Sequence, residues 1–249
     1  MRILLGWLFT PLFLISFFLV LLVFHALQWL GKHLGGYKAH KISVDWMKYF
    51  LLWSVRCSGA RIRLHKTVEI PENVPLVIIS NHQSMFDVPM IGWLLRKHHP
   101  KYVSKKELAY GVPAISYNLR HGGSVLIDRK NARQSIVALA NFGKYLQEKR
   151  FAGCIFPEGT RSRDGNLKPF KTKGLDAILR KAPDAWIVPV VVYGNWEIER
   201  YKFRPVPFGI VCGCEILTPF KADEYEDIET LTEHAKASIS TAYQKYFQA

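Results

Sequence analysis

The chain has 249 residues, of which 49% are hydrophobic, and it carries 34 Lys and Arg against 20 Asp and Glu. This apolar content excludes a largely disordered chain, which combines low hydrophobicity with high net charge. Basic residues recur every few positions after Lys32, which argues against a protein with many membrane spans. No repeat with a period of about 20–50 residues is present, so a solenoid is excluded. The length fits one compact domain with an additional segment.

The net charge of +14 is unevenly distributed, because the last 29 residues hold six acids and only three bases. The strongly positive remainder is expected to attract phosphate-rich or acidic partners. These partners could be nucleic acid, anionic lipid or an acidic carrier protein, and charge alone does not choose among them.

The N-terminal segment indicates a membrane. No Asp, Glu, Lys or Arg occurs in the 29 residues from Ile3 to Gly31, and about 20 apolar residues in a helix can cross a bilayer core. A cleaved signal peptide is the alternative, but its apolar region would be about 7–15 residues long and would end at a small-x-small site, which is missing here. Pro11 can kink the helix or turn it back. The anchor is therefore either one spanning helix or a two-helix hairpin embedded in one leaflet.

Residues 46–53 mix aromatic and basic side chains. Trp and Tyr favour the membrane–water boundary, so this segment either lies along the membrane surface or forms an amphipathic core helix. We predict membrane-anchoring helical segments at residues 1–56 and an α/β domain at 57–249. Only Arg2 precedes the apolar stretch, whereas several bases follow it, so the positive-inside tendency places the domain on the cytoplasmic face of the membrane. These bases are Lys32, Lys38 and Lys41.

The four cysteines agree with a cytoplasmic location. They show no C-x-x-C spacing and no partnered His pair, so neither a disulfide framework nor a metal site is expected. Cys212 and Cys214 lie two residues apart in an apolar run, which places them on one face of a strand as buried free thiols.

Residues 57–249 alternate between β-rich runs and helical patterns. The clearest helix is expected at 131–149, where Asn131 can cap the first turn, and Ile136, Leu139, Gly143 and Leu146 share a face. An acidic helix at about 223–247 closes the chain. This alternation predicts an α/β fold with a mostly parallel, mixed sheet flanked by helices. The expected strands cover residues 76–80, 102–104, 124–128, 153–157, 186–193 and 208–217.

The first polar motif, Asn81-His82-Gln83-Ser84-Met85-Phe86-Asp87, directly follows the strand at 76–80. Five residues along one helix rotate the chain by about 500°, so His82 and Asp87 can meet only if His82 precedes the helix and Asp87 lies in its first turn. The Ser84-x-x-Asp87 spacing is typical of such a helix start. Asp87 either merely completes this cap or orients His82 as a general base.

No G-x-S-x-G elbow occurs anywhere in the chain, so no serine nucleophile is evident. The simplest scheme has His82 activate a hydroxyl group of the substrate itself, without an acyl-enzyme.

Three further motifs place cations at strand ends. Phe156-Pro157-Glu158-Gly159-Thr160-Arg161-Ser162 contains a glycine that allows close backbone approach and an arginine that can bind phosphate. Leu126-Ile127-Asp128-Arg129 ends in a second arginine, and Lys105 and Lys106 follow another short strand. Each could be a solvated basic loop. Together they suit a phosphate-bearing lipid with a free hydroxyl.

These residues resemble the motifs of the membrane-bound glycerolipid acyltransferases, most closely the lysophosphatidic acid acyltransferases. That family is marked by N-H-x-x-x-x-D, by a glycine and apolar strand ending in I-D-R, by F-P-E-G-T-R-S, and by an apolar strand with V-P-V. All four occur here in order, over about 110 residues. They lie at Asn81–Asp87, Gly123–Arg129, Phe156–Ser162 and Val188–Val190. Met85-Phe86 and Val125-Leu126 depart from the usual residues, with expected effects on packing and acyl preference.

The resemblance implies the roles of the site residues. His82 would be the general base and Asp87 its partner. Lys105, Arg129, Glu158, Gly159, Thr160 and Arg161 would hold the glycerol-phosphate part, with Lys106 as an alternative to Lys105. Neither a metal nor a cofactor is expected.

The implied reaction transfers a fatty acyl group from acyl carrier protein or coenzyme A to the sn-2 hydroxyl of lysophosphatidic acid, which gives phosphatidic acid. The implied partners are the phospholipid bilayer and these substrates, and not nucleic acid. Three alternatives remain open: another lysolipid acceptor, a membrane-bound lipid hydrolase, and a membrane-tethered binder of anionic polymers.

Overall fold

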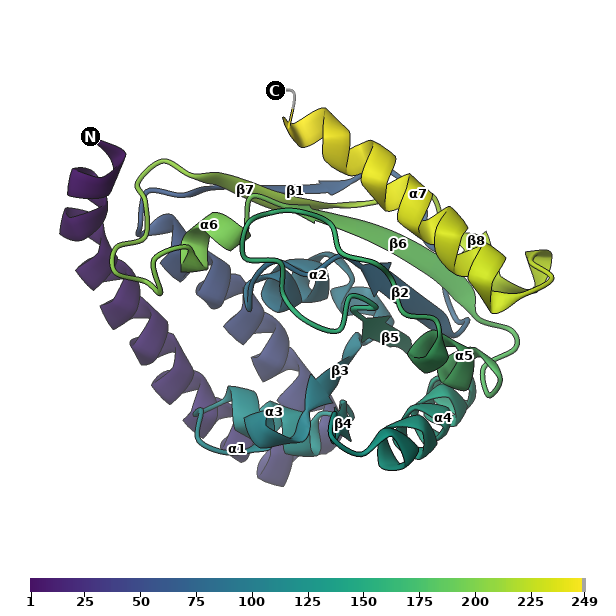
Figure 1. Ribbon diagram of the computed structural model, residues 1–249. Helices are drawn as coiled ribbons and strands as arrows, with labels where there is room; N and C mark the ends of the chain where they lie inside the picture. The colour runs from purple at the N-terminus through teal and green to yellow at the C-terminus, as the bar shows by residue number, and fades with distance from the viewer. Residues whose placement is uncertain (248–249) are drawn as a thin grey trace.

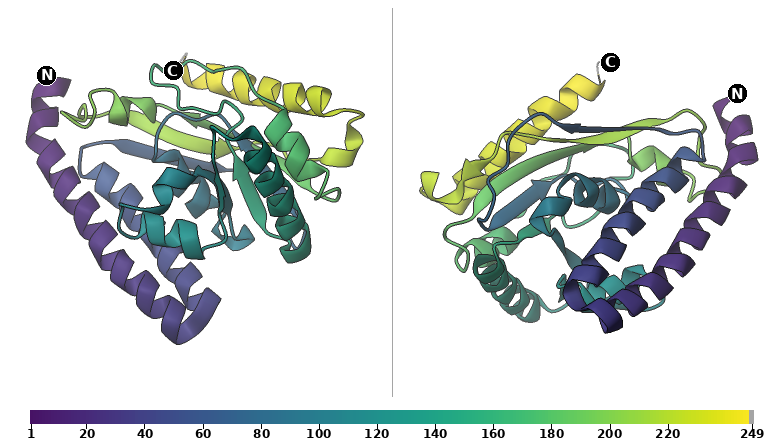
Figure 2. Two further views of the ribbon diagram at one scale, coloured as in Figure 1. Left: turned by 60° about the horizontal axis from the view of Figure 1, so that its bottom comes forward. Right: turned by 180° about the vertical axis from the view of Figure 1, so that it is seen from behind.

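The computed structural model describes residues 1–247. Its N-terminal helix α1 (Arg2–Arg56) consists of two helical halves joined at Gly36, whose φ of 62° is a conformation that other residues rarely adopt. The interruption therefore falls at Gly36 and not at Pro11, which lies inside the first half. Figure 2 shows the two halves running back along the domain as a hairpin.

The sheet has the strand order β1-β7-β6-β2-β5-β3-β4, and β8 pairs with β6. Strands β6, β2, β5, β3 and β4 run parallel, β7 is antiparallel to β6, and β1 is parallel to β7. The predicted mostly parallel, mixed sheet is confirmed. Its strands are β1 (Arg61–Lys66), β2 (Leu76–Ser80), β3 (Lys101–Lys105), β4 (Val125–Ile127), β5 (Ala152–Ile155), β6 (Trp186–Tyr193), β7 (Val211–Ile216) and β8 (Phe220–Lys221).

The sequence prediction missed β1 and β8. β1 is an edge strand with only Ile62 and Leu64 between charged residues, so its apolar alternation is short. β8 is only two residues long. The six strands that were predicted are all present with small differences at their ends.

Helices cover both faces of the sheet (Figure 1). One apolar cluster joins α1 and α2 (Asp87–Leu94) to one face, and a second joins α4 (Ala132–Lys149), α5 (Lys173–Leu179) and α7 (Ile228–Phe247) to the other. The predicted closing helix thus begins at Ile228, after a short 3-10 turn at Ala222–Glu224. The remaining helical segments are α3 (Ile115–His121), α6 (Trp196–Glu199) and the 3-10 turns Arg96–His98 and Lys106–Ala109.

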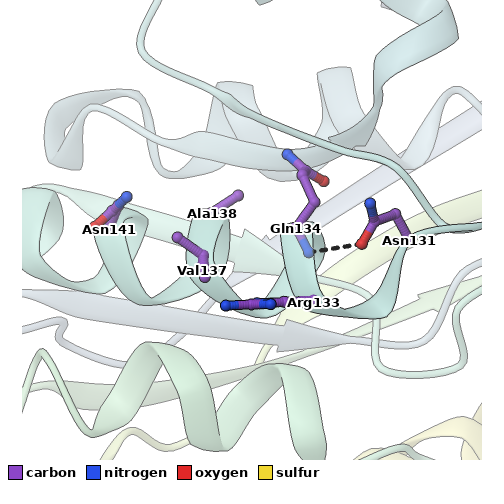
Figure 3. Close-up of a pocket in the computed structure, with 6 residues that line it drawn as sticks. All are labelled: Asn131, Arg133, Gln134, Val137, Ala138 and Asn141. Atoms are coloured by element: carbon purple, nitrogen blue, oxygen red, sulfur yellow. Dashed lines mark hydrogen bonds between the residues drawn. The ribbon is translucent and has the colours of Figure 1, made fainter.

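Helix α4 confirms the predicted cap, because Asn131 Oδ1 accepts a hydrogen bond of 2.9 Å from the Gln134 backbone N–H. Leu139, Gly143 and Leu146 on the predicted shared face are buried, whereas Ile136, at the start of that face, is 40% exposed. The start of α4 lies beside β4, which is only three residues long and therefore covers little of the helix. A shallow hollow of about 440 Å³ lies on the first turns of α4 (Figure 3). None of the predicted site residues lines it.

The hairpin buries one side against the domain and exposes a broad apolar side. Phe13 packs against Phe86, and Leu21 and Phe24 join Met47 and other residues in a third apolar cluster. In segment 46–53, Met47, Lys48, Leu51 and Leu52 are buried, whereas Trp46, Phe50 and Trp53 are exposed, which is the pattern of an amphipathic helix. By length and composition α1 could cross a membrane. Its exposed apolar residues include Leu4, Trp7, Leu8, Leu12, Ile15, Phe18, Leu19, Leu22, Leu34, Trp46 and Trp53.

Cys154, Cys212 and Cys214 are buried, Cys57 is partly buried, and all four are free thiols. Burial raises the pKa of the Cys154 and Cys214 thiols well above the ordinary range. The prediction that Cys212 and Cys214 are buried free thiols on one strand is confirmed, and Cys154 is buried in the sheet as well.

Candidate active site

The predicted motifs follow the carboxyl ends of four parallel strands that lie side by side in the order β2, β5, β3, β4. His82 follows β2, Glu158 and Arg161 follow β5, Lys105 ends β3, and Arg129 follows β4. Because parallel strands end at one edge of a sheet, the fold brings these segments to the same edge, where ligands of such sheets gather.

His82 and Asp87 are in direct contact. The distance from His82 Nδ1 to Asp87 Oδ2 is 2.8 Å. Helix α2 begins at Asp87, so the acid lies in the first turn and His82 precedes the helix, as the spacing required. With the Nδ1–H donating this hydrogen bond to the carboxylate, Nε2 is left as the unprotonated nitrogen of the neutral ring.

The Asp87 carboxylate is fully buried and held from several sides. Its Oδ2 also accepts backbone hydrogen bonds from Gln83 (2.7 Å) and Ser84 (2.9 Å). Its Oδ1 accepts one of 2.7 Å from the Asn195 side chain. Asp87 therefore closes the turn before α2 and also holds the imidazole by its Nδ1.

The start of α2 differs from the expected capping box. Ser84 does not cap the helix, whose N-cap is Phe86 without a side-chain cap bond. The Ser84 hydroxyl instead donates to Glu199 Oε1 at 2.9 Å. The reason is tertiary, because α6 brings the Glu199 carboxylate to this turn.

Other side chains fix the loop that carries His82. Asn81 exchanges two hydrogen bonds of 2.8 Å with the backbone of Val192, which links the end of β2 to β6. The His82 ring stacks on Phe156, with centroids 4.1 Å apart and planes inclined by 17°. The His82 carbonyl accepts a hydrogen bond of 2.7 Å from the Ser162 N–H. The imidazole is thereby held against the loop that follows β5.

In that loop, Gly159 has a φ of 74°, which explains why glycine occupies the position. Glu158 beside it is 4% exposed, and its Oε1 accepts a bond of 3.3 Å from the His82 N–H. Its Oε2 is buried without a hydrogen-bond partner among residues 1–247. Burial raises the pKa of Glu158 to about 7. A protonated Glu158 can donate a hydrogen bond to a ligand here.

Arg161 is paired within the protein. Its Nη1 donates to Glu199 Oε1 at 2.7 Å, and the same oxygen accepts the Met85 N–H at 2.8 Å. Arg161 thus connects the loop after β5, through Glu199, to the turn before α2. The side chain of Thr160, its neighbour, accepts a hydrogen bond from Lys168 at 3.2 Å.

Lys105 and Lys106 have different surroundings. Lys106 Nζ forms an ion pair of 2.5 Å with Asp128 Oδ2. Lys105 is exposed and has no ion pair among the described residues. It is also in register with Ile127 of the neighbouring strand, two residues before Arg129. Arg129 follows β4, which is three strands away from β2 in the sheet order.

Sequence reasoning missed Asn195 and Glu199, which follow β6. Asn195 is fully buried, and its backbone N–H donates to Gln83 Oε1 at 3.0 Å. The position of Asn195 directly after the V-P-V strand was the available indication, because polar residues at strand ends of such sheets are candidate site residues.

A family model described as Acyltransferase matches residues 61–193. The 1-acyl-sn-glycerol-3-phosphate acyltransferase of Limnanthes douglasii is 31% identical over 60% of this chain and 51% of its own length. The enzyme of that name from Salmonella typhimurium is 27% identical, over 72% of this chain and 71% of its own. The chain thus spans about half the length of the first of these relatives.

A crystal structure of the 1-acyl-sn-glycerophosphate (LPA) acyltransferase from Thermotoga maritima has the same fold. Its TM-score is 0.82 at 17% identity, and the match covers 100% of this chain and 99% of that one. The matched family segment begins with β1 and ends with β6, and it includes all four motifs. The chain belongs to the acyltransferase family.

Proposed function

We propose that this protein is a 1-acyl-sn-glycerol-3-phosphate acyltransferase, which transfers a fatty acyl group from a thioester to the sn-2 hydroxyl of lysophosphatidic acid. The observation that carries the proposal is the contact of 2.8 Å between His82 Nδ1 and the buried Asp87 carboxylate. The family membership and the names of the relatives support it.

In the reaction, His82 Nε2 takes the proton of the acceptor hydroxyl while its oxygen attacks the thioester carbonyl carbon. Asp87 stabilises the imidazolium that forms. The tetrahedral intermediate then collapses, the C–S bond breaks, and the imidazolium returns the proton to the leaving thiolate. The products are phosphatidic acid and a free thiol, and no covalent acyl-enzyme, metal or further cofactor is needed.

The acceptor phosphate is held by cations at the carboxyl ends of β3 and β4, on the same edge of the sheet as His82. Lys105 and Arg129 supply free positive charge, since Lys106 is already paired with Asp128. Arg161 supports the site through Glu199, and its remaining guanidinium N–H groups can bind the phosphate. Glu158, Gly159 and Thr160 complete the contact with the glycerol-phosphate part.

The apolar outer side of the hairpin lies in one leaflet of the membrane. Both halves of α1 pack on the domain, at Phe13 and Leu52 for example, which supports a hairpin embedded in one leaflet over a spanning helix. The acceptor then reaches His82 from the membrane. The thioester arrives from the cytoplasm as acyl carrier protein or coenzyme A, both of which are acidic and suit the net charge of +14.

The test is an assay of purified protein with lysophosphatidic acid and each acyl donor in turn. We expect phosphatidic acid to form, and His82→Ala to lose at least about 1000-fold in kcat with an unchanged circular dichroism spectrum. Full activity of His82→Ala would overturn the mechanism. Free fatty acid in place of diacyl lipid would indicate a hydrolase, and preference for another lysolipid would change the acceptor.

A further inference from the structure

A second cluster of charged side chains is buried away from the active site. It lies between the second half of α1 and the beginning of β3. Lys101 is the first residue of β3, whereas Lys105 at the active-site edge is its last. The cluster therefore occupies the opposite edge of the sheet from His82. Its members are Lys41, Asp45, Lys48, His99 and Lys101.

Positive charge exceeds negative charge in this cluster. Lys48 is 5% and Lys101 6% exposed, so both ammonium groups are withdrawn from water. Asp45 pairs with Lys41 and, at 3.2 Å, with Lys48. Three lysines thus share one carboxylate. Lys101 has no carboxylate partner among the described residues.

The surroundings of Lys101 are those of a cation that lacks a counter-ion. Its Nζ donates a hydrogen bond of 3.0 Å to the Tyr37 hydroxyl and lies 4.8 Å from the centroid of the Tyr37 ring. Burial and the nearby Lys48 lower the pKa of Lys101 to about 7. A buried charge without a partner costs several kcal/mol in general. An anion at this place would remove that cost.

These side chains surround a cavity of about 20 Å³. A water molecule needs about 10–15 Å³ by the same measure, so the cavity admits one atom-sized ligand of water-like or slightly larger size. Besides the lysines, Asn118 and Ser124 line the cavity with side chains that can donate hydrogen bonds. The Asp45 carboxylate is already engaged by two lysines.

We propose that this cavity is a binding site for one small monovalent anion of the size of chloride, held by Lys48 and Lys101. The site stands apart from the acyltransferase reaction and does not depend on the proposed function. Because Lys48 belongs to α1 and Lys101 to β3, the anion fastens the hairpin to the domain. The Lys48 stem also lies against Gly92 of α2, where a Cβ would come within 2.8 Å of it. Lys48 therefore also contacts α2, the helix that begins at Asp87.

The experiment compares thermal unfolding of the full chain in a nonionic detergent at constant ionic strength, in sodium chloride and in sodium gluconate, whose anion is too large for the cavity. We expect chloride to raise the unfolding midpoint by about 3 °C, in a saturable way. Bromide should act like chloride, whereas phosphate should act like gluconate.

Two variants shift the effect in opposite directions. Lys101→Met should lose the chloride effect while remaining folded, because an apolar side chain of similar length fills the site. Asp45→Asn removes the carboxylate, so its midpoint should rise more in chloride than that of the unmodified protein. Lys144→Met is the matched control, since that side chain is 70% exposed, and it should keep the original chloride effect.

Equal midpoints in chloride and gluconate for both the unmodified protein and Asp45→Asn would overturn the proposal. So would a chloride effect that persists in Lys101→Met, because the anion would then act elsewhere. Stabilisation by phosphate alone would also contradict it, because an ester or inorganic phosphate is larger than the cavity.

Discussion

Asn195 donates a hydrogen bond of 2.7 Å to Asp87. The carboxylate that contacts His82 is therefore itself held by a residue that follows β6, the strand paired with β2. Asn195 touches neither the imidazole nor the reacting atoms of the proposed reaction, and it acts by positioning. Together with the backbone N–H groups of Gln83 and Ser84, it satisfies both oxygens of a buried anion.

Asn195→Ala should therefore lower kcat by about 10- to 100-fold, since a hydrogen bond to a buried charged group is worth about 1.5–3 kcal/mol. The KM for the acceptor should stay within about twofold, because the cations at the strand ends are unchanged. Steady-state kinetics with varied lysophosphatidic acid measure both. Asn141→Ala, on the exposed side of α4, is the control. An effect on KM alone would contradict a positioning role.

Lys105 and Lys106 form a matched pair for locating the phosphate. Lys105→Met should raise the acceptor KM by about tenfold, because it removes a charge that is free to bind phosphate. Lys106→Met should change it less than about twofold, since this ammonium already pairs with Asp128. The same kinetic assay compares the two variants. If Lys106→Met had the larger effect, the ligand would have to displace Asp128, and the assignment would reverse.

Glu158 should impose a pH dependence on stability. Its pKa is raised from 4.5 to about 7 by burial. Between these values the folded protein keeps a proton that the unfolded chain has lost. The free energy of unfolding therefore falls as pH rises through this window, by up to about 1.4 kcal/mol per pH unit, and levels off above it.

Glu158→Gln should remove this slope, because the amide is neutral at every pH. Denaturant unfolding in detergent at pH 5, 6, 7 and 8 measures the difference between the two proteins. Glu148→Gln, at a side chain that is 57% exposed, should leave the slope unchanged. Parallel pH curves for Glu158→Gln and the unmodified protein would show that Glu158 ionises normally.

The exposed side of the hairpin should bind lipid. Leu19 and Leu22 are 58% and 60% exposed on α1, and Leu19→Glu combined with Leu22→Glu places two charges where acyl chains would lie. We expect this double variant to lose at least about tenfold in its partition to phosphatidylglycerol vesicles, measured by sedimentation. Val137→Glu, on the exposed side of α4, should bind as before. Unchanged binding of the double variant would place the membrane contact elsewhere.

The sequence by itself determined six of the eight strands, the long amphipathic helix and the residues of the His82–Asp87 pair. Local physics suffices for these, because apolar runs mark buried strands and the five-residue spacing allows contact only across a helix start. The apolar stretch after Ile3 likewise predicted an anchor from composition alone.

Only the tertiary structure decided how distant segments meet. Glu199 and Asn195 follow β6, more than 100 residues after His82, and they reach its loop because β6 pairs with β2. The buried side of the hairpin was likewise decided by the tertiary structure, because it depends on the packing of α1 against α2 and the sheet. Lys48 and Lys101 look like solvated bases in the sequence, yet folding buries both. Whether a lysine is buried depends on how distant segments pack together. Burial then shifts the pKa of its ammonium group, and neither the residue type nor its position in the sequence reveals this.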